Sequence, residues 1–122
     1  MVQIGNHLKM NVAHGLRPRT REFYDGLLKC KPLASPRDDL DLYEFAGGFV
    51  LGLFFVDPAE TLSDDKYLKG MWMELKVDDP AAWKDRLLEF GVTPVEFPDP
   101  TRFFFAAPGG QVFRVAPIDG GL

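Results

Sequence analysis

The sequence predicts an α+β fold in which two βαβββ modules form paired, curved, mixed sheets around a central cleft. The main observation is an internal repeat, because three sets of positions recur in the same order in both halves. Their separations are 60, 62 and 65 residues. The matched sets are Phe23, Asp25, Leu27 and Leu28 with Trp83, Asp85, Leu87 and Leu88; Gly47-Gly48 with Gly109-Gly110; and Leu8, Met10 and Val12 with Met73, Leu75 and Val77. We therefore expect a single domain with modules at 6–56 and 70–117 and a linker at 57–69.

Composition supports a folded domain and narrows the partners. The 122 residues are 46% hydrophobic and 26% charged, which is typical of a packed core. The net charge of −4, without a basic stripe, argues against a nucleic-acid partner. No apolar run is long enough to span a membrane, and the N-terminus lacks the apolar core of a signal peptide. The single cysteine, Cys30, cannot form an internal disulfide, so we expect a cytoplasmic protein with a buried structural thiol.

In the first module, residues 7–12 alternate between apolar and polar side chains, which indicates a half-buried strand. A helix is expected over 20–28, with Thr20 as its N-cap. A short edge strand at 31–35 and strands at 40–45 and 49–56 follow, and Gly47-Gly48 turns the chain between the last two.

The second module repeats this order. Residues 71–77 alternate, and Asp79-Pro80 is a typical helix start, with Gly91 as the stop. Strands are expected at 93–97, 103–107 and 112–116. The linker between the modules is polar, and its Asp64-Asp65 pair would make it either an acidic lid or a solvated connector.

Pairing across the two hairpins predicts which side chains share a sheet face. We expect Phe105 opposite Arg114, Phe103 opposite Ala116, Tyr43 opposite Gly52, and Phe45 opposite Val50. Phe104, Phe113 and Val115 would then form an apolar face covered by a helix. The other, mixed face would line the cleft with His7, Lys9, Asn11, Asp41, Tyr43, Phe45, Gly52, Phe54, Trp72, Glu74, Phe103, Phe105 and Arg114.

Several motifs add to the repeat. They are His7 at the start of the first strand, Arg21-Glu-Phe-Tyr24 followed by Leu27-Leu28, Val77-Asp78-Asp79 before the second helix, and a Pro108-Gly109 turn before the last strand. With these motifs the chain resembles the vicinal oxygen chelate superfamily, which includes glyoxalase I, extradiol dioxygenases, and fosfomycin- and bleomycin-resistance proteins. The resemblance covers nearly the whole chain, although the Pro108-Gly109 turn lacks the Asp and Asn that often flank it in the family. Because members of the family commonly form homodimers, the resemblance also implies that this protein is a homodimer.

The resemblance also implies a divalent metal held by one side chain from the first and one from the last strand of each module. These positions correspond to His7, Gly52, Trp72 and Arg114, of which only His7 can bind a metal. A rearranged site with His7, Glu74 and a further carboxylate such as Asp41 is the alternative. Pairing of Glu74 with Arg114 is the simpler expectation, because a buried guanidinium needs a counterion. We therefore expect no metal and no cofactor.

Aromatic rings mixed with a few charges are typical of a small-molecule site, although the same rings could fill a closed core. Arg114 could bind a carboxylate or phosphate, and His7 could serve as a general base, but no second catalytic partner is evident. The prediction favours a metal-free protein that sequesters or senses a small, possibly aromatic ligand over an enzyme. The alternatives are a metal-dependent lyase, isomerase or dioxygenase, and a structural domain without ligand. The predicted ligand-binding residues are His7, Lys9, Tyr43, Phe45, Phe54, Trp72, Glu74, Phe103, Phe105 and Arg114.

Overall fold

A computed structural model describes residues 1–62, 66–67, 70–96 and 100–120 of the chain. The chain divides into two compact units, Met1–Thr61 and Leu62–Leu122, and each is described by itself. Asp64 and Asp65, the expected lid residues, lie outside the described residues. No helix in the described part of the chain is long and apolar enough to cross a membrane.

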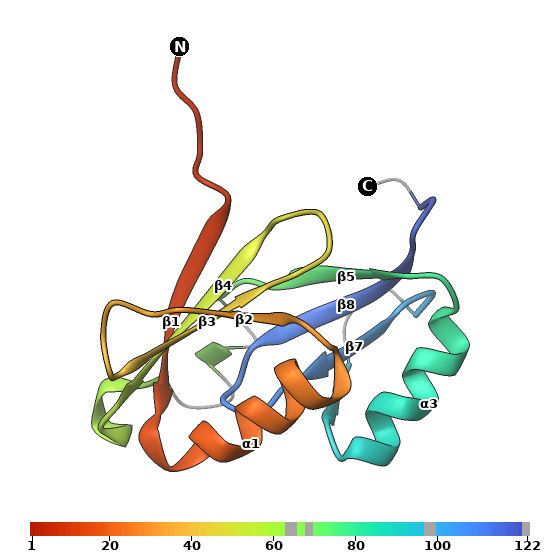
Figure 1. The fold of residues 1–122 in the computed structure, drawn as a ribbon. Helices are drawn as coiled ribbons and strands as arrows, with labels where there is room; N and C mark the ends of the chain where they lie inside the picture. The colour runs from red at the N-terminus through yellow and green to blue at the C-terminus, as the bar shows by residue number, and fades with distance from the viewer. Residues whose placement is uncertain (63–65, 68–69, 97–99, 121–122) are drawn as a thin grey trace. The chain divides into compact units, whose positions relative to one another are not determined.

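The first unit is a four-stranded mixed sheet with one helical segment (Figure 1). Its strand order is β1-β4-β3-β2, with β1 parallel to β4 and the other pairs antiparallel. The strands are β1 (His7–Ala13), β2 (Lys31–Leu33), β3 (Leu40–Glu44) and β4 (Val50–Val56). A short 3-10 turn, η3 (Pro58–Glu60), follows β4 and is capped by the Asp57 carboxylate, which accepts from the Ala59 amide.

The second unit repeats this topology. Its strand order is β5-β8-β7-β6, again with the first pair parallel and the others antiparallel. The elements are β5 (Met73–Val77), α3 (Pro80–Phe90), β6 (Thr93–Val95), β7 (Phe103–Ala106) and β8 (Val112–Pro117). The Asp79 carboxylate accepts from the Ala82 amide at the start of α3, and Gly91 ends the helix in the left-handed conformation. The predicted α+β fold with two similar βαβββ modules is therefore confirmed.

The first helical segment begins earlier than the sequence suggested. A 3-10 turn, η1 (His14–Leu16), leads into α1 (Arg17–Arg21), which continues as a π-helix, η2 (Glu22–Leu27). Thr20 is buried inside this segment, and its hydroxyl donates to the Arg17 carbonyl at 2.8 Å, so its assignment as the N-cap was wrong. Pro18 explains the earlier start, because its fixed φ suits the first turn of a helix.

The pairing register of both hairpins also differs from the prediction by one residue. The expected pairs correspond to two-residue loops, whereas each loop here has three residues, 46–48 and 108–110. The Gly48 amide donates to the Phe45 carbonyl at 3.0 Å, and the Gly110 amide donates to Ala107 at 2.9 Å. All four glycines of the two loops have φ between 90° and 96°, a region that side chains with a Cβ rarely adopt. A one-residue change of register moves every side chain of a strand to the other face.

Each sheet consequently has one face that packs on its helix, here called the helix face. In the first unit the ring of Tyr24 stacks on Tyr43 with centroids 5.2 Å apart, and it meets Phe45 edge-on at 6.4 Å. In the second unit Phe105 stacks between Phe103 and Phe113, at 5.8 and 5.5 Å. The Lys84 ammonium of α3 lies 5.4 Å from the Phe103 ring. The side of each sheet away from the helix is called the opposite face.

The end of η2 gives a first testable prediction. Lys29 has φ of 58° and is the only described residue other than glycine with positive φ. It follows the C-cap Leu28, a position that strongly prefers glycine. We expect Lys29→Gly to be more stable than Lys29→Ala by about 1 kcal/mol, because only glycine adopts this conformation without a Cβ penalty. Urea denaturation measures the difference.

A control replaces Lys31, which lies in strand β2, with the same two residues. There the order of stability should reverse, since glycine weakens a strand. The interpretation of Lys29 is wrong if its glycine variant is the less stable of the pair.

Candidate functional site

The opposite face of the first sheet has a gap at its centre, at Gly52. The register sets Gly52 of β4 between Lys9 of β1 and Leu42 of β3. A Cβ at this position would lie 2.9 Å from the Lys9 Cγ and 3.1 Å from the Leu42 Cδ2. The aliphatic stem of Lys9 and the Leu42 side chain therefore close over the glycine, and a larger residue would displace them.

A pocket of about 220 Å³ lies on this face, and all of its lining residues belong to the first unit. Its polar lining comes from Asn6, His7 and Lys9 at the start of β1. Its apolar lining comes from Pro36, Leu40, Leu42 and Val50. Phe54 occupies the next row of the same face, opposite Asn11 and Leu40, and the Arg37 guanidinium lies 5.3 Å from its ring.

The opposite face of the second sheet carries a compact cluster around Arg114. Glu74 and Arg114 pair directly across β5 and β8, and the Arg114 Nε donates to the Glu74 Oε2 at 2.9 Å. The Arg114 guanidinium also lies 5.0 Å from the Trp72 ring centroid. The Trp72 ring meets Phe104 edge-on at 5.5 Å, although 43% of Trp72 remains exposed. The expected Glu74–Arg114 pair is thus confirmed, and Trp72 presents an aromatic surface beside it.

Five residues that were expected on the mixed face lie on the helix faces instead. The register puts Phe104, and neither Phe103 nor Phe105, opposite Arg114, and it puts Leu42 opposite Gly52. Tyr43 and Phe105 are almost completely buried. The structure keeps together the predicted residues His7, Lys9 and Phe54 in the first unit, and Trp72, Glu74 and Arg114 in the second. It separates from them Asp41, Tyr43, Phe45, Phe103 and Phe105.

The residues at the four positions inferred for the family metal do not form a metal site. Gly52 has no donor atom and no space for one, while Trp72 and Arg114 have no usable lone pair. The carboxylate of Glu74, which the alternative site would need, already pairs with Arg114. Within residues 1–62, 66–67, 70–96 and 100–120, no group of three or more His, Cys, Asp or Glu side chains could hold a metal ion. Only His7 retains a donor, and one donor cannot hold a divalent ion.

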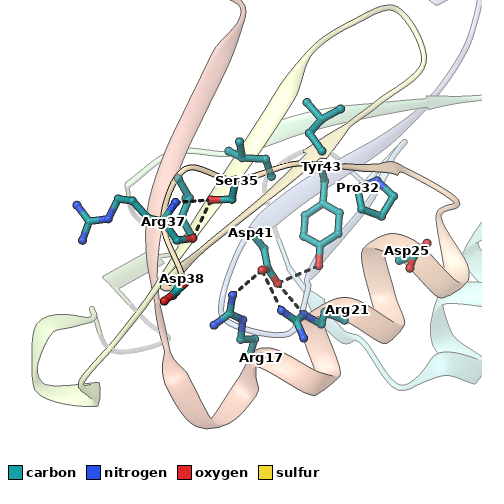
Figure 2. A pocket seen from close by; sticks show the side chains of 12 residues that line it. Arg17, Arg21, Asp25, Pro32, Ser35, Arg37, Asp38, Asp41 and Tyr43 are labelled. Carbon is teal, nitrogen blue, oxygen red and sulfur yellow. Dashed lines mark hydrogen bonds and ion pairs between the residues drawn. The ribbon is translucent and has the colours of Figure 1, made fainter.

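An unpredicted charged cluster lies on the helix face of the first sheet (Figure 2). The Asp41 carboxylate accepts from the Arg17 Nη2 at 2.7 Å and from the Arg21 Nε at 2.9 Å. It also accepts from the Tyr43 hydroxyl at 3.3 Å. Arg17 lies with its guanidinium 4.7 Å from the Phe55 ring. The cluster borders a cavity of about 400 Å³ and joins α1 to β3.

The environment of Asp41 shifts its acidity strongly. Burial by itself would raise the pKa of Asp41, but the hydrogen bonds and charges of Arg21 and Arg17 outweigh it and lower the pKa to about 2. Burial raises the pKa of Tyr43, and the negative charge of Asp41 raises it further. The ionised carboxylate between two guanidinium groups therefore stabilises the docking of the helix on the sheet. The i, i+4 spacing of Arg17 and Arg21 was the available sequence signal, once the helix is extended back to Arg17.

Cys30 is buried, and burial raises the pKa of its thiol to about 12. A thiol with a raised pKa holds little of the reactive thiolate. The prediction of a buried structural thiol is confirmed.

The order of the elements defines the class of the protein, an α+β fold with two βαβββ modules. No protein-family model matches the chain, and no curated protein matches it. Solved structures do. An NMR structure of an Agrobacterium tumefaciens protein is 22% identical, with a TM-score of 0.67, and the match covers 98% of this chain and all of the other.

Two further solved structures identify the fold within that class. The fosfomycin resistance protein FosX of Listeria monocytogenes, solved with Mn(II) and sulfate, has a TM-score of 0.74 at 12% identity, covering 100% of this chain and 94% of its own. A possible glyoxalase of Bacillus cereus has a TM-score of 0.61 at 21% identity, covering 90% and 95%. The chain therefore has the vicinal oxygen chelate fold, as the sequence predicted.

The Asp41 cluster gives a prediction about acid stability. A lowered pKa means that the stabilising contribution is complete above the unfolded-state pKa of about 3.8 and is lost as the pH falls toward about 2. We expect Asp41→Asn to lower the free energy of unfolding at pH 7 by about 2 kcal/mol. The difference between wild type and variant should shrink between pH 4 and pH 2, as measured by urea denaturation across that range.

Asp39→Asn is the matched control, because Asp39 forms a bidentate pair with Arg37 at an exposed site. Its stability should remain close to that of the wild type, since exposed ion pairs contribute little. An Asp41→Asn variant whose deficit is the same at every pH would contradict the assigned role of the carboxylate.

Proposed function

We propose that this protein binds a small, aromatic molecule without a metal ion, as a sequestering or sensing protein of the glyoxalase/bleomycin-resistance type. The observation that carries the proposal is the Glu74–Arg114 pair beside the exposed ring of Trp72. By the family resemblance, Trp72 and Arg114 stand at positions of metal ligands. A guanidinium there repels a divalent cation, and its partner carboxylate is already neutralised.

The same cluster supports an aromatic ligand. The Trp72 ring packs perpendicular to the Phe104 ring, and the Arg114 guanidinium lies over its face, so its orientation is constrained before any ligand arrives. A large part of the residue nevertheless remains accessible. A pre-oriented aromatic side chain loses little conformational entropy on binding, which favours stacking of a planar ligand.

The resemblance to metal-dependent relatives makes metal retention the first test. The purified protein is incubated with Mn²⁺, Co²⁺, Ni²⁺ or Zn²⁺, dialysed, and analysed by mass spectrometry of the metal content. We expect retention far below one ion per chain. Retention of about one ion, lost on Glu74→Gln, would overturn the proposal in favour of a rearranged metal site and an enzyme.

Stacking on Trp72 is tested with the planar probes indole, 2-naphthol and quinoline. The chain has two tryptophans, so Trp83→Phe leaves Trp72 as the sole tryptophan reporter. We expect the probes to quench its fluorescence with saturation, and Trp72→Ala to weaken binding about tenfold, measured by calorimetry, as loss of an aromatic contact predicts.

Trp83→Phe is itself the control for this experiment. Trp83 lies on α3 with the Arg86 guanidinium 3.9 Å from its ring, so it offers a similar stacked surface elsewhere in the same unit. Its replacement should leave probe affinity unchanged. If all three probes fail to bind the wild type, or bind Trp72→Ala equally well, the site is not at Trp72.

A further inference from the structure

We infer that the pocket around Lys9 and Gly52 in the first unit binds a small anion with an apolar body, such as a short-chain carboxylate or alkyl phosphate. This inference rests on the proposed function in one respect, because both place a small ligand on the opposite face of a sheet. Its residues are entirely distinct from the Trp72 cluster, because Lys9 and Gly52 belong to the other unit.

The position of Lys9 depends on Gly52. The absence of a Cβ at Gly52 lets the Lys9 stem lie across β4, where it approaches the Leu42 side chain from the opposite side of the gap. A lysine stem packed on apolar surface holds its ammonium group at the rim of that surface. Gly52 therefore positions Lys9 at the pocket.

The lining of the pocket carries positive charge. The lining of the pocket includes Lys9, His7 and the Asn6 amide, which donates to the Gly48 carbonyl at 3.1 Å, but no acidic residue among those described. In the described part of the chain, the side chains of Lys9 and His7 form neither a hydrogen bond nor an ion pair, although their backbones belong to the β1–β4 ladder. This contrasts with Arg114, whose charge Glu74 balances. Lys9 is exposed, so it acts as a surface cation without an ion-pair partner, and such a charge at the edge of apolar walls attracts an anionic ligand.

The size and shape of the pocket limit the ligand that it can hold. The walls are the side chains of Pro36, Leu40, Leu42 and Val50, and the volume is about 220 Å³. A cavity of about 150 Å³ is sufficient for benzene. The pocket therefore has room for a body of about six carbon atoms but not for a large drug, and its single lysine suits one anionic head group.

Gly52 stands at a position that the family resemblance assigns to a metal-binding carboxylate. A carboxylate at Gly52 would neutralise Lys9, whereas glycine leaves the lysine charge free to act on a ligand. Lys9 thus supplies the positive charge that a metal ion would otherwise bring to this face, and an anion bound there would contact the ammonium directly.

The test uses the full chain and four probes: hexanoate, butyl phosphate, hexan-1-ol and hexylammonium. Binding is followed by calorimetry and by NMR shifts of the Lys9 and Gly52 amides. We expect hexanoate or butyl phosphate to bind with saturation, and the comparison of the two distinguishes a carboxylate from a phosphate head. The neutral and cationic probes should bind at least about tenfold more weakly, as loss of a charge-assisted hydrogen bond predicts.

Three variants locate the site. Lys9→Gln should weaken anion binding about tenfold or more. Gly52→Ala should also weaken it, because the added methyl group displaces the Lys9 stem. Lys31→Gln is the matched control, since it removes the same charge from exposed strand β2 of the same sheet outside the pocket, and it should bind like the wild type.

Several results would overturn the inference. They are equal binding of hexan-1-ol, no binding of either anion, or equal losses in Lys9→Gln and Lys31→Gln. The outcome is separable from that of the aromatic site, because each site has its own probes and its own variant: hexanoate and Lys9→Gln test this pocket, whereas indole and Trp72→Ala test the ring of Trp72. Circular dichroism spectra and melting temperatures confirm that each variant is folded before its affinity is compared.

Discussion

The loop that joins the two central strands of each unit determines what the sheet presents on either face. Each loop places two consecutive glycines at positive φ and contains three residues that have no partner residue in the strand ladder. That length sets Leu42 opposite Gly52 and Phe104 opposite Arg114. A loop shorter by one residue would exchange the faces of β3 or β7. Aromatic rings that now pack under the helices would then take the place of the residues beside Gly52 and Arg114.

This constraint explains which parts of the structure the sequence could predict. The strands and helices follow from local periodicity and from the internal repeat, and their observed bounds lie close to the predicted ones except at the start of the first helix. Lys9, Gly52 and Arg114 were assigned to the correct face, because β1, β4, β5 and β8 share one alternation pattern. The errors in assigning faces fall on β3, with the adjoining Phe45, and on β7. A Gly-Gly pair is compatible with loops of two or of three residues, so sequence does not decide between their registers.

The Asp41 cluster was missed for two reasons that reinforce one another. The register error put Asp41 on the wrong face, and the late helix start left Arg17 in a turn. With both corrected, the carboxylate meets two arginines one helical turn apart. The low pKa of Asp41 shows that the arginines more than offset its burial. The cluster thus attaches the helical segment to the sheet, as the stacked rings of Tyr24 and Tyr43 also do.

The two units place a cationic side chain on corresponding faces but balance its charge differently. Arg114 has Glu74 as a partner, so the pair is neutral and the accessible feature is the Trp72 ring. Lys9 has Gly52 beside it, which offers space in place of a carboxylate. Because electrostatic attraction requires an unbalanced charge, we propose an anion as the ligand of the first unit and a planar, uncharged ring as that of the second. The same fold occurs in a protein solved with Mn(II), whereas the positive charges on the opposite faces of the two units here are those of Lys9 and Arg114. In the first unit the position of Lys9 depends on a glycine, because a Cβ at Gly52 would lie 2.9 Å from the Lys9 Cγ.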